Sequence, residues 1–293
     1  MFCGLTTALV TPFDRQQKID VSSYTKLLEH QVEHAVHQVV VCGTTGEGPT
    51  ITEEEFILLV ALAVERGLTV IANAGTNCTQ MSVRRAHLAK EQGAQGLLVI
   101  APYYNCPDVR GIMAHIQARC AVGLPVMFYY HPKRTGVQLG LEDLYRILSI
   151  PGVVAMKDAS LEGTYTQRLR EEVPHVLQLA GDDLRVLDVM QQGGNGVVSV
   201  LSNAFPGTLR TIVQLGKEGE WERGRKNLAA LTPLIQALSR EVNPQGIKCL
   251  LGLLQRCENV LRLPLVPVTP QVKQEIKRTM QETRRALKLL CAC

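Results

Sequence analysis

Eight short apolar runs recur over the first two thirds of the chain. Each run is apolar on consecutive positions and rich in valine, isoleucine and leucine. This pattern is typical of strands that are buried on both faces, as in a parallel sheet. The runs cover residues 5–10, 38–43, 68–75, 96–104, 125–130, 152–158, 176–183 and 196–202.

Segments between these runs carry the signals of helix ends. Asp20 precedes an amphipathic stretch, Thr52 and Glu55 have the spacing of a capping box, and Gly67 follows that second stretch. Further helix starts are expected at Thr79, Gly140 and Asp183. This alternation predicts βαβ units. Eight strands in about 200 residues favour a closed (β/α)8 barrel over an open Rossmann sheet, whose glycine fingerprint is absent.

Strand signals stop after residue 205, and helical stretches follow. They cover residues 206–215, 217–239, 244–256 and 270–290, with proline-containing breaks at 243–244 and 263–270. We therefore expect a catalytic barrel over residues 1–220 and a small helical domain over residues 221–293.

The bulk properties exclude several classes of protein. Hydrophobic residues make up 46% of the 293 residues, which is enough for one large core with a smaller appendage. The net charge of +4 is small and spread out, so we expect no nucleic-acid partner. No apolar run approaches the roughly 20 residues that span a bilayer. The apolar N-terminus lacks the basic region of a signal peptide and is interpreted as a strand.

The nine cysteines are scattered, with no CxxC pair and no Cys/His cluster at zinc spacing. Reduced core thiols in a cytoplasmic protein explain them better than disulfides or a metal. Cys291 and Cys293 could bind a metal, but a frayed tail is the favoured interpretation. His30, His34 and His37 share one helical face, and we expect no carboxylate to complete a zinc site there.

Lys157 is the sharpest single candidate, because barrel enzymes place catalytic groups at the carboxyl ends of their strands. It follows the apolar residues VVAM, so its charged form is desolvated and its pKa should fall. A neutral amine can attack a carbonyl and form an imine. The alternative is a buried lysine paired with a carboxylate, Asp158 or Asp182.

Tyrosines cluster at two of the strand ends, and they include Tyr104 and Tyr129. Imine chemistry needs protons to move between the amine, the hydroxyl and the substrate. A phenol titrates near 10, so a relay at neutral pH needs an organised hydroxyl chain, which Thr44 or Thr45 could complete. The alternative is that these tyrosines belong to the core or to an interface.

Two further strand ends offer groups that bind carboxylates. The turn GTTGEG (43–48) can present backbone N–H groups, although a tight turn explains its glycines equally well. Arg134 can bind a carboxylate through two hydrogen bonds, but an isolated loop arginine is more often a surface residue.

Taken together, these motifs resemble the superfamily of pyruvate-dependent class I aldolases, which includes dihydrodipicolinate synthases and N-acetylneuraminate lyases. The resemblance covers essentially the whole chain. The double threonine Thr44-Thr45, Arg134 in an RTG segment and the NPxxxK segment of the tail favour the dihydrodipicolinate synthase family. The motifs are GTTGEGPT (43–50), APYYNCP (101–107), FYYHPKRTG (128–136), VVAMKDAS (153–160), GDD (181–183), GGNGVVSVLSNAFP (193–206), EVNPQGIK (241–248) and LRLPLVPVT (261–269).

The resemblance implies a role for each strand-end residue. Lys157 forms the imine with pyruvate, and Tyr129 moves protons beside it. Thr44 links Tyr129 to Tyr104, which reaches across a dimer interface into the neighbouring site. The family often forms dimers of dimers, so a homo-oligomer is expected, at least a dimer and in the family pattern a tetramer.

The resemblance also implies the substrates. Thr45, Gly181 and the backbone around Val198 bind pyruvate and its surroundings, and Arg134 binds the carboxylate of L-aspartate 4-semialdehyde. An aldol-type condensation and a cyclisation then give 4-hydroxy-tetrahydrodipicolinate, the first committed step towards diaminopimelate and lysine. No metal or organic cofactor is required, because the lysine is the electron sink.

The sequence departs from the family pattern at several positions. Tyr130 and His131 stand where Asn and a small apolar residue are common, and Asp158 stands where Glu is common. In the feedback site for lysine, Asn77 and Tyr103 fit the pattern. Glu53, Phe56 and Met81 do not, and Met81 cannot pair with an ammonium group. We therefore expect lysine to inhibit weakly or not at all.

Two alternatives stay open at this point, and a third is rejected. Another pyruvate aldolase, acting on N-acetylneuraminate or a 2-keto-3-deoxy sugar acid, would share Lys157 and Tyr129. A non-catalytic barrel would be expected to lose a relay residue, and all of them are present. A zinc-dependent aldolase lacks ligands.

Overall fold

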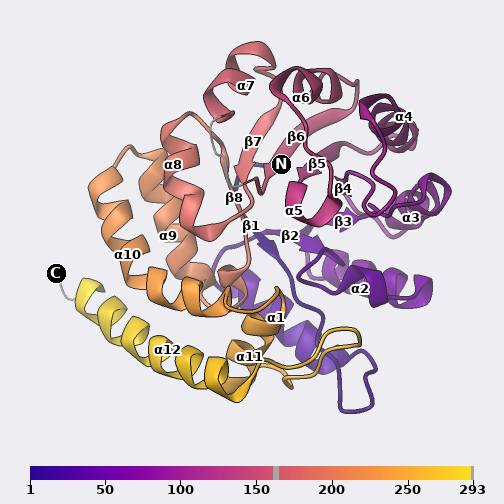
Figure 1. The fold of residues 1–293 in the computed structure, drawn as a ribbon. Coiled ribbons are helices and arrows are strands. Elements are labelled where there is room, and N and C mark those ends of the chain that lie inside the picture. Colours follow the sequence, from indigo (N-terminus) through magenta and orange to yellow (C-terminus); the bar gives the residue numbers. More distant parts are fainter. Residues whose placement is uncertain (161–164, 292–293) are drawn as a thin grey trace.

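The computed structural model describes residues 1–160 and 165–291 and shows a closed barrel of eight parallel strands in chain order, as predicted (Figure 1). β1 pairs with both β2 and β8, which closes the sheet. The strands are β1 (Gly4–Ala8), β2 (Gln38–Val41), β3 (Thr69–Asn73), β4 (Gly96–Ile100), β5 (Val126–Tyr130), β6 (Val153–Asp158), β7 (Leu177–Ala180) and β8 (Gly196–Ser199).

The barrel encloses its own apolar core, separate from the layer between strands and helices. Side chains alternate between the two sides of a strand, so every second residue points inward. On β5 the inward residues are Met127 and Tyr129, and both are buried in the inner core. The register of β5 on β6 places Tyr129 beside Lys157. Strand pairing thus fixes the relation between these two side chains.

Helices surround the barrel, and several begin where the sequence predicts. The Asp20 carboxylate accepts a hydrogen bond from the Ser23 N–H, and Thr52 and Glu55 form the expected capping box. The helices of the barrel layer are α1 (Val21–Glu33), α2 (Glu53–Glu65), α3 (Thr79–Glu91), α4 (Val109–Cys120), α5 (Pro132–Thr135), α6 (Leu141–Leu148), α7 (Thr166–Glu172), α8 (Val186–Gln191) and α9 (Pro206–Lys217). Short 3-10 helices are η1 (Gly48–Thr50), η2 (Asp183–Arg185) and η3 (Leu201–Asn203).

The last three helices form a layer at one side of the barrel. They are α10 (Trp221–Leu238), α11 (Gln245–Leu253) and α12 (Pro270–Cys291), close to the predicted stretches. Figure 1 shows α12, in yellow, running along the outside of α10 and α11, with which it packs. Among the described helices, none is both long enough and apolar enough to cross a membrane.

Candidate active site

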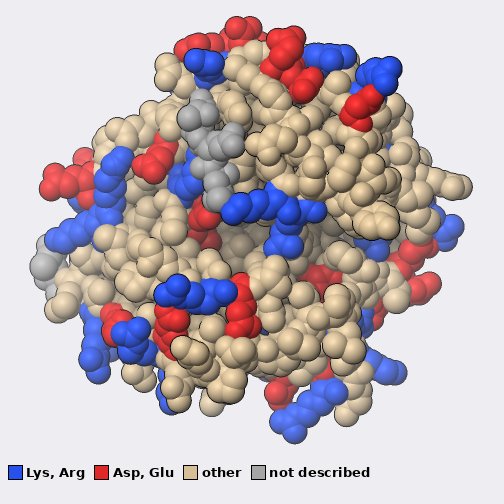
Figure 2. Space-filling model, in the orientation of Figure 1, with Lys and Arg blue, Asp and Glu red and all other residues tan. Residues whose placement is uncertain are grey.

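A cavity of about 240 Å³ lies at the carboxyl ends of the strands. Figure 2 shows a hollow near the centre of this face, with Lys and Arg side chains across its rim. The structure brings six of the predicted site residues together around the cavity. They are Thr44, Thr45, Tyr129, Arg134, Lys157 and Gly181.

Lys157 is buried at the end of β6, with its Nζ 4.3 Å from the centroid of the Tyr129 ring. Burial and the nearby Arg134 cation together lower the pKa of Lys157 to about 8, although the Asp183 carboxylate acts in the opposite direction. A lowered pKa leaves a useful fraction of the amine neutral near physiological pH. The carboxylate that acts on the lysine charge is therefore Asp183, whereas the sequence suggested Asp158 or Asp182.

Tyr129 is buried beside the lysine, and burial raises the pKa of its phenol. Arg134 and a hydrogen bond with the Thr44 side chain act in the opposite direction. The structure thus contains the Thr44–Tyr129 link that the sequence predicts. The two hydroxyls can pass a proton without ionising either group fully.

Two predicted site residues lie elsewhere in this single chain. The Tyr104 side chain is 91% exposed and is not among the residues that line the cavity. Its backbone φ of 74° is in the left-handed region, which is uncommon for a tyrosine. Val198 is fully buried in the inner core, and Val200 and Leu201 line the cavity in its place.

Asp183 is a cavity residue that the sequence interpretation treated only as a helix start. Its carboxylate accepts hydrogen bonds from the backbone N–H groups of Val200 (3.0 Å) and Leu201 (2.9 Å). Burial raises the pKa of Asp183 to about 6. The GDD motif placed it at a strand end, but only the fold shows that it anchors the end of β8.

Asn243 is a second residue that the sequence interpretation missed. Its side-chain Nδ2 donates to the Thr45 hydroxyl at 2.9 Å, and its backbone carbonyl accepts from Arg134 Nη2 at 3.4 Å. Ile235 and Leu238 of α10 line the same cavity. The helical tail therefore completes the mouth of the barrel, a contact across the whole chain that no local pattern reveals.

A buried ion pair joins the GTTGEG turn to the tail. Glu47 and Lys248 contact each other with both side chains fully buried, and Lys248 Nζ also donates to the Val260 carbonyl at 2.8 Å. The other Glu47 oxygen accepts from the Arg262 backbone N–H at 2.9 Å. The lysine of NPxxxK thus holds the turn that carries Thr44 and Thr45.

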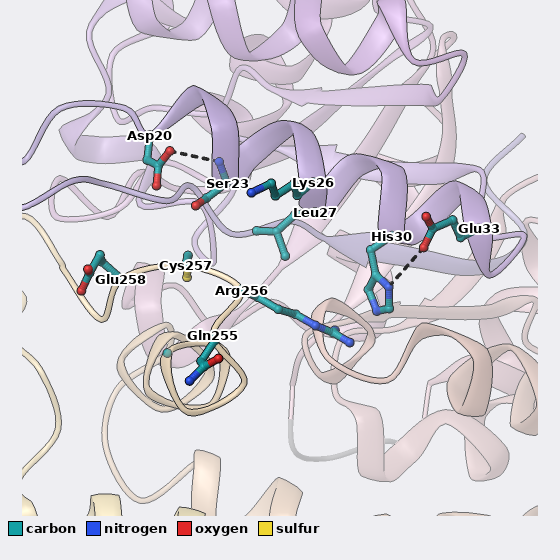
Figure 3. Close-up of a pocket in the computed structure, with 11 residues that line it drawn as sticks. Asp20, Ser23, Lys26, Leu27, His30, Glu33, Gln255, Arg256, Cys257 and Glu258 are labelled. Atoms are coloured by element: carbon teal, nitrogen blue, oxygen red, sulfur yellow. Dashed lines mark hydrogen bonds and ion pairs between the residues drawn. The ribbon is translucent and has the colours of Figure 1, made fainter.

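A cavity of about 580 Å³ lies apart from this site, between α1 and the segment after α11 (Figure 3). Side chains of both charges line it, including Glu258 and Arg256. Glu33 and His30, which line this cavity, lie close to His34, and the ligand atoms of the three are within 4.8 Å of one another, so the expectation of no carboxylate was wrong. Burial and the Arg256 cation lower the pKa of His30 to about 4. That same cation disfavours a metal ion beside His30.

The feedback residues are spread over a neighbouring region. Tyr103 lines a cavity of about 400 Å³ that shares Thr44, Tyr129 and Arg134 with the site. Asn77 is not among its lining residues, and its carbonyl accepts from the Asn105 side chain. Met81 is 44% exposed.

Seven cysteines of the described chain are free thiols, but only Cys42, Cys249 and Cys257 among them are buried, so the expectation of core thiols was wrong for the other four. Cys293 and the side chain of Cys291 lie outside the described residues.

Comparisons with known proteins point to one family. A model of the Dihydrodipicolinate synthetase family matches residues 1–283. The 4-hydroxy-tetrahydrodipicolinate synthase of Syntrophotalea carbinolica is 34% identical over 285 residues, which cover 96% of this chain and 97% of the relative.

Solved structures agree. The 4-hydroxy-tetrahydrodipicolinate synthase from Methylacidiphilum fumariolicum SolV matches with a TM-score of 0.95 at 34% identity, covering 99% of this chain and 98% of that one. A structure described as the first monomeric dihydrodipicolinate synthase variant matches with a TM-score of 0.93 at 34% identity, covering 97% of each chain.

Proposed function

The chain belongs to the dihydrodipicolinate synthetase family, and we propose that Lys157 is the residue through which it binds pyruvate. It condenses pyruvate with L-aspartate 4-semialdehyde to give 4-hydroxy-tetrahydrodipicolinate, in the pathway to diaminopimelate and lysine. The observation that supports Lys157 is its burial at the barrel mouth, against Tyr129 and with a lowered pKa.

The covalent steps follow from the chemistry of an amine. Neutral Lys157 attacks the keto carbon of pyruvate, and loss of water gives the imine. The protonated imine acidifies the methyl group, which loses a proton to form an enamine. The enamine carbon attacks the aldehyde carbon of the second substrate, whose oxygen takes up a proton. The amino group of that substrate then attacks the imine carbon, closes the ring and releases Lys157.

Tyr129 and Thr44 carry the protons in this proposal. Tyr129 lies against the amine, and its hydrogen bond with Thr44 supplies the next hydroxyl. Tyr104 of a second copy would complete the relay, which explains why it projects into solvent in the single chain. The working enzyme is therefore at least a dimer, and the family pattern is a dimer of dimers.

The remaining site residues bind carboxylates. Thr45, held by Asn243, and Gly181 contact pyruvate, while Arg134 at the rim binds the carboxylate of the semialdehyde. The reaction needs no metal or organic cofactor, because Lys157 itself withdraws the electrons.

We place the protein in the cytoplasm and divide it into a barrel (1–220) and a helical domain (221–293).

Borohydride reduction in the presence of pyruvate tests the central claim. The hydride fixes the imine as a stable secondary amine, and peptide mass mapping locates it. We expect the adduct on Lys157 and none in Lys157→Ala. Pyruvate that is trapped on another lysine, or not trapped at all, contradicts the proposal. Parallel assays with sialic acid and 2-keto-3-deoxygluconate test the related aldolase activities.

A further inference from the structure

His131 stands at the mouth of the barrel, directly after β5. Met127 and Tyr129 point into the barrel, so the next inward position on this strand is His131. It lines the 240 Å³ cavity with Lys157 and Arg134. Its ring lies edge-on to the Tyr129 ring, with centroids 5.7 Å apart. His131 therefore occupies the layer above the reacting lysine, on the side from which a second substrate must approach.

The imidazole is short of a partner in this position. Its Nδ1 is buried and accepts or donates no hydrogen bond within the described part of the chain. A buried polar atom without a partner is unfavourable, and at the wall of a cavity a ligand can supply the missing bond. Burial, Arg134 and Lys157 lower the pKa of His131 to about 4, so the ring is neutral near pH 7.

The neighbouring charges restrict what this ring can recognise. Arg134 lies at the rim and suits the carboxylate of the second substrate, whose aldehyde must reach the enamine on Lys157. The amino group of L-aspartate 4-semialdehyde is on the carbon next to that carboxylate, so it comes close to Arg134. Since the Arg134 cation can only donate hydrogen bonds, a neutral ring nitrogen with a free lone pair is the acceptor that an amino group needs.

We propose that His131 is a specificity-determining residue that accepts a hydrogen bond from the amino group of the second substrate. Together with Arg134 it would select an α-amino carboxylate over an aldehyde that lacks the amino group. This inference rests on the proposed function, because it takes the imine of Lys157 as the place of reaction. It assigns to His131 no part in forming that imine.

The test compares two aldehydes on a set of variants. L-aspartate 4-semialdehyde carries the amino group, and succinic semialdehyde has the same chain without it. His131→Leu removes the acceptor at similar volume, and His131→Asn keeps an acceptor close to the position of Nδ1. Lys133→Ala, an exposed neighbour outside the cavity, is the matched control.

In His131→Leu we expect the KM for aspartate semialdehyde to rise about tenfold. Binding of succinic semialdehyde, measured by competition, should stay unchanged, and His131→Asn should recover most of the lost affinity. Borohydride trapping of pyruvate should match that of the unaltered protein in all variants.

An unchanged KM in His131→Leu overturns the inference, and so does an equal loss for both aldehydes. Slower pyruvate trapping in His131→Leu also overturns it, because the ring would then act on the first half of the reaction. Failure to trap pyruvate on Lys157 in the unaltered protein is a different result, which contradicts the proposed function itself.

Discussion

Lys157 and Tyr129 are register partners on neighbouring strands, and the lysine Nζ lies 4.3 Å from the centroid of the tyrosine ring. The face of the ring attracts a cation, while burial of both groups disfavours charge. The site thus holds an amine that is easily deprotonated next to a phenol that is hard to ionise. Lys157 can therefore react as a neutral amine, and Tyr129 stays protonated and can donate its proton to a substrate.

The rate of imine formation should follow the charge of Lys157. Only the neutral amine reacts, so the rate of borohydride trapping with pyruvate should rise with pH to a plateau, with a midpoint near 8. Arg134→Gln removes a cation that lowers this pKa, so the midpoint should move to higher pH. Arg134→Lys keeps the charge and serves as the control. A midpoint that moves to lower pH in Arg134→Gln contradicts the electrostatic account.

Lys157→Met should inactivate the enzyme and stabilise its fold. The folded pKa, about 8, is below the ordinary value of 10.5, so the unfolded chain binds this proton more tightly. The buried charge therefore costs about 3 kcal/mol of unfolding free energy at pH 7. The increase in the free energy of unfolding of Lys157→Met should be largest below pH 8, shrink as the pH rises towards 10.5, and vanish above it. Urea unfolding at several pH values measures this, and a gain that does not change with pH contradicts it.

Thr44 should matter through its hydroxyl. Thr44→Val removes the hydrogen bond to Tyr129 at constant shape, and Tyr129→Phe removes the phenol itself. We expect kcat to fall about 100-fold in Tyr129→Phe and by a smaller factor in Thr44→Val, because proton transfer slows. Thr44→Ser keeps the hydroxyl and should retain most of the activity. Equal activity of the Val and Ser variants would remove Thr44 from the relay.

Much of the fold can be predicted from the sequence, because a strand buried on both faces shows as a run of consecutive apolar residues. The consecutive apolar residues of each run identified all eight strands, although most runs extend past the strand, as 96–104 does past Ile100. Ala101 and Pro102 stay buried beyond the carboxyl end of β4 without pairing, so hydrophobicity alone does not show where a strand stops. The helices α4 and α7 were not predicted individually. The Asp108 carboxylate caps α4 by accepting from the Gly111 N–H, a signal that the sequence interpretation missed, whereas no side chain among the described residues caps α7.

The site was predicted less completely, for a different reason. Lys157 and Tyr129 lie at strand ends, and Arg134 lies in the short helix α5 that follows β5, so the barrel geometry brings all three to the same cavity. Asn243 reaches the site from a helical segment, and its contact with Thr45 is set by tertiary packing. The choice of Asp183 over Asp182 as the charge beside Lys157 likewise depends on which carboxylate is turned inward.

Tyr104 should act on the site of another subunit. A Lys157→Ala chain lacks the amine but keeps Tyr104. A Tyr104→Phe chain lacks the phenol but keeps Lys157. Mixed after reversible dissociation, the two variants should recover activity, because the Tyr104→Phe site receives the phenol of the other chain. Activity assays of the mixture, with sedimentation velocity to confirm hybrid formation, measure this. If the mixture stays as inactive as its parts while hybrids form, Tyr104 acts within its own chain or not at all.

L-lysine should inhibit this enzyme weakly or not at all. Met81 is exposed and uncharged, so it offers nothing to the ammonium group of the amino acid. Steady-state rates should therefore be unchanged by lysine in the sub-millimolar range. Met81→Glu supplies the missing charge and should make inhibition stronger, whereas Met81→Gln should not. Potent inhibition of the unaltered enzyme would show that lysine is bound through other residues.

The hydrogen bond between Asn243 and Thr45 joins residues that are 198 positions apart in the chain. The ion pair of Glu47 with Lys248 spans a similar interval. When all eight strands have left the ribosome, Asn243 and Lys248 have therefore not yet been synthesised. These are the residues that hold the turn carrying Thr44 and Thr45. A nascent barrel can close before its mouth is organised, so the reactive lysine stays without its full surroundings until the tail has been translated and docked. The order of synthesis thus delays activity until the chain is nearly finished.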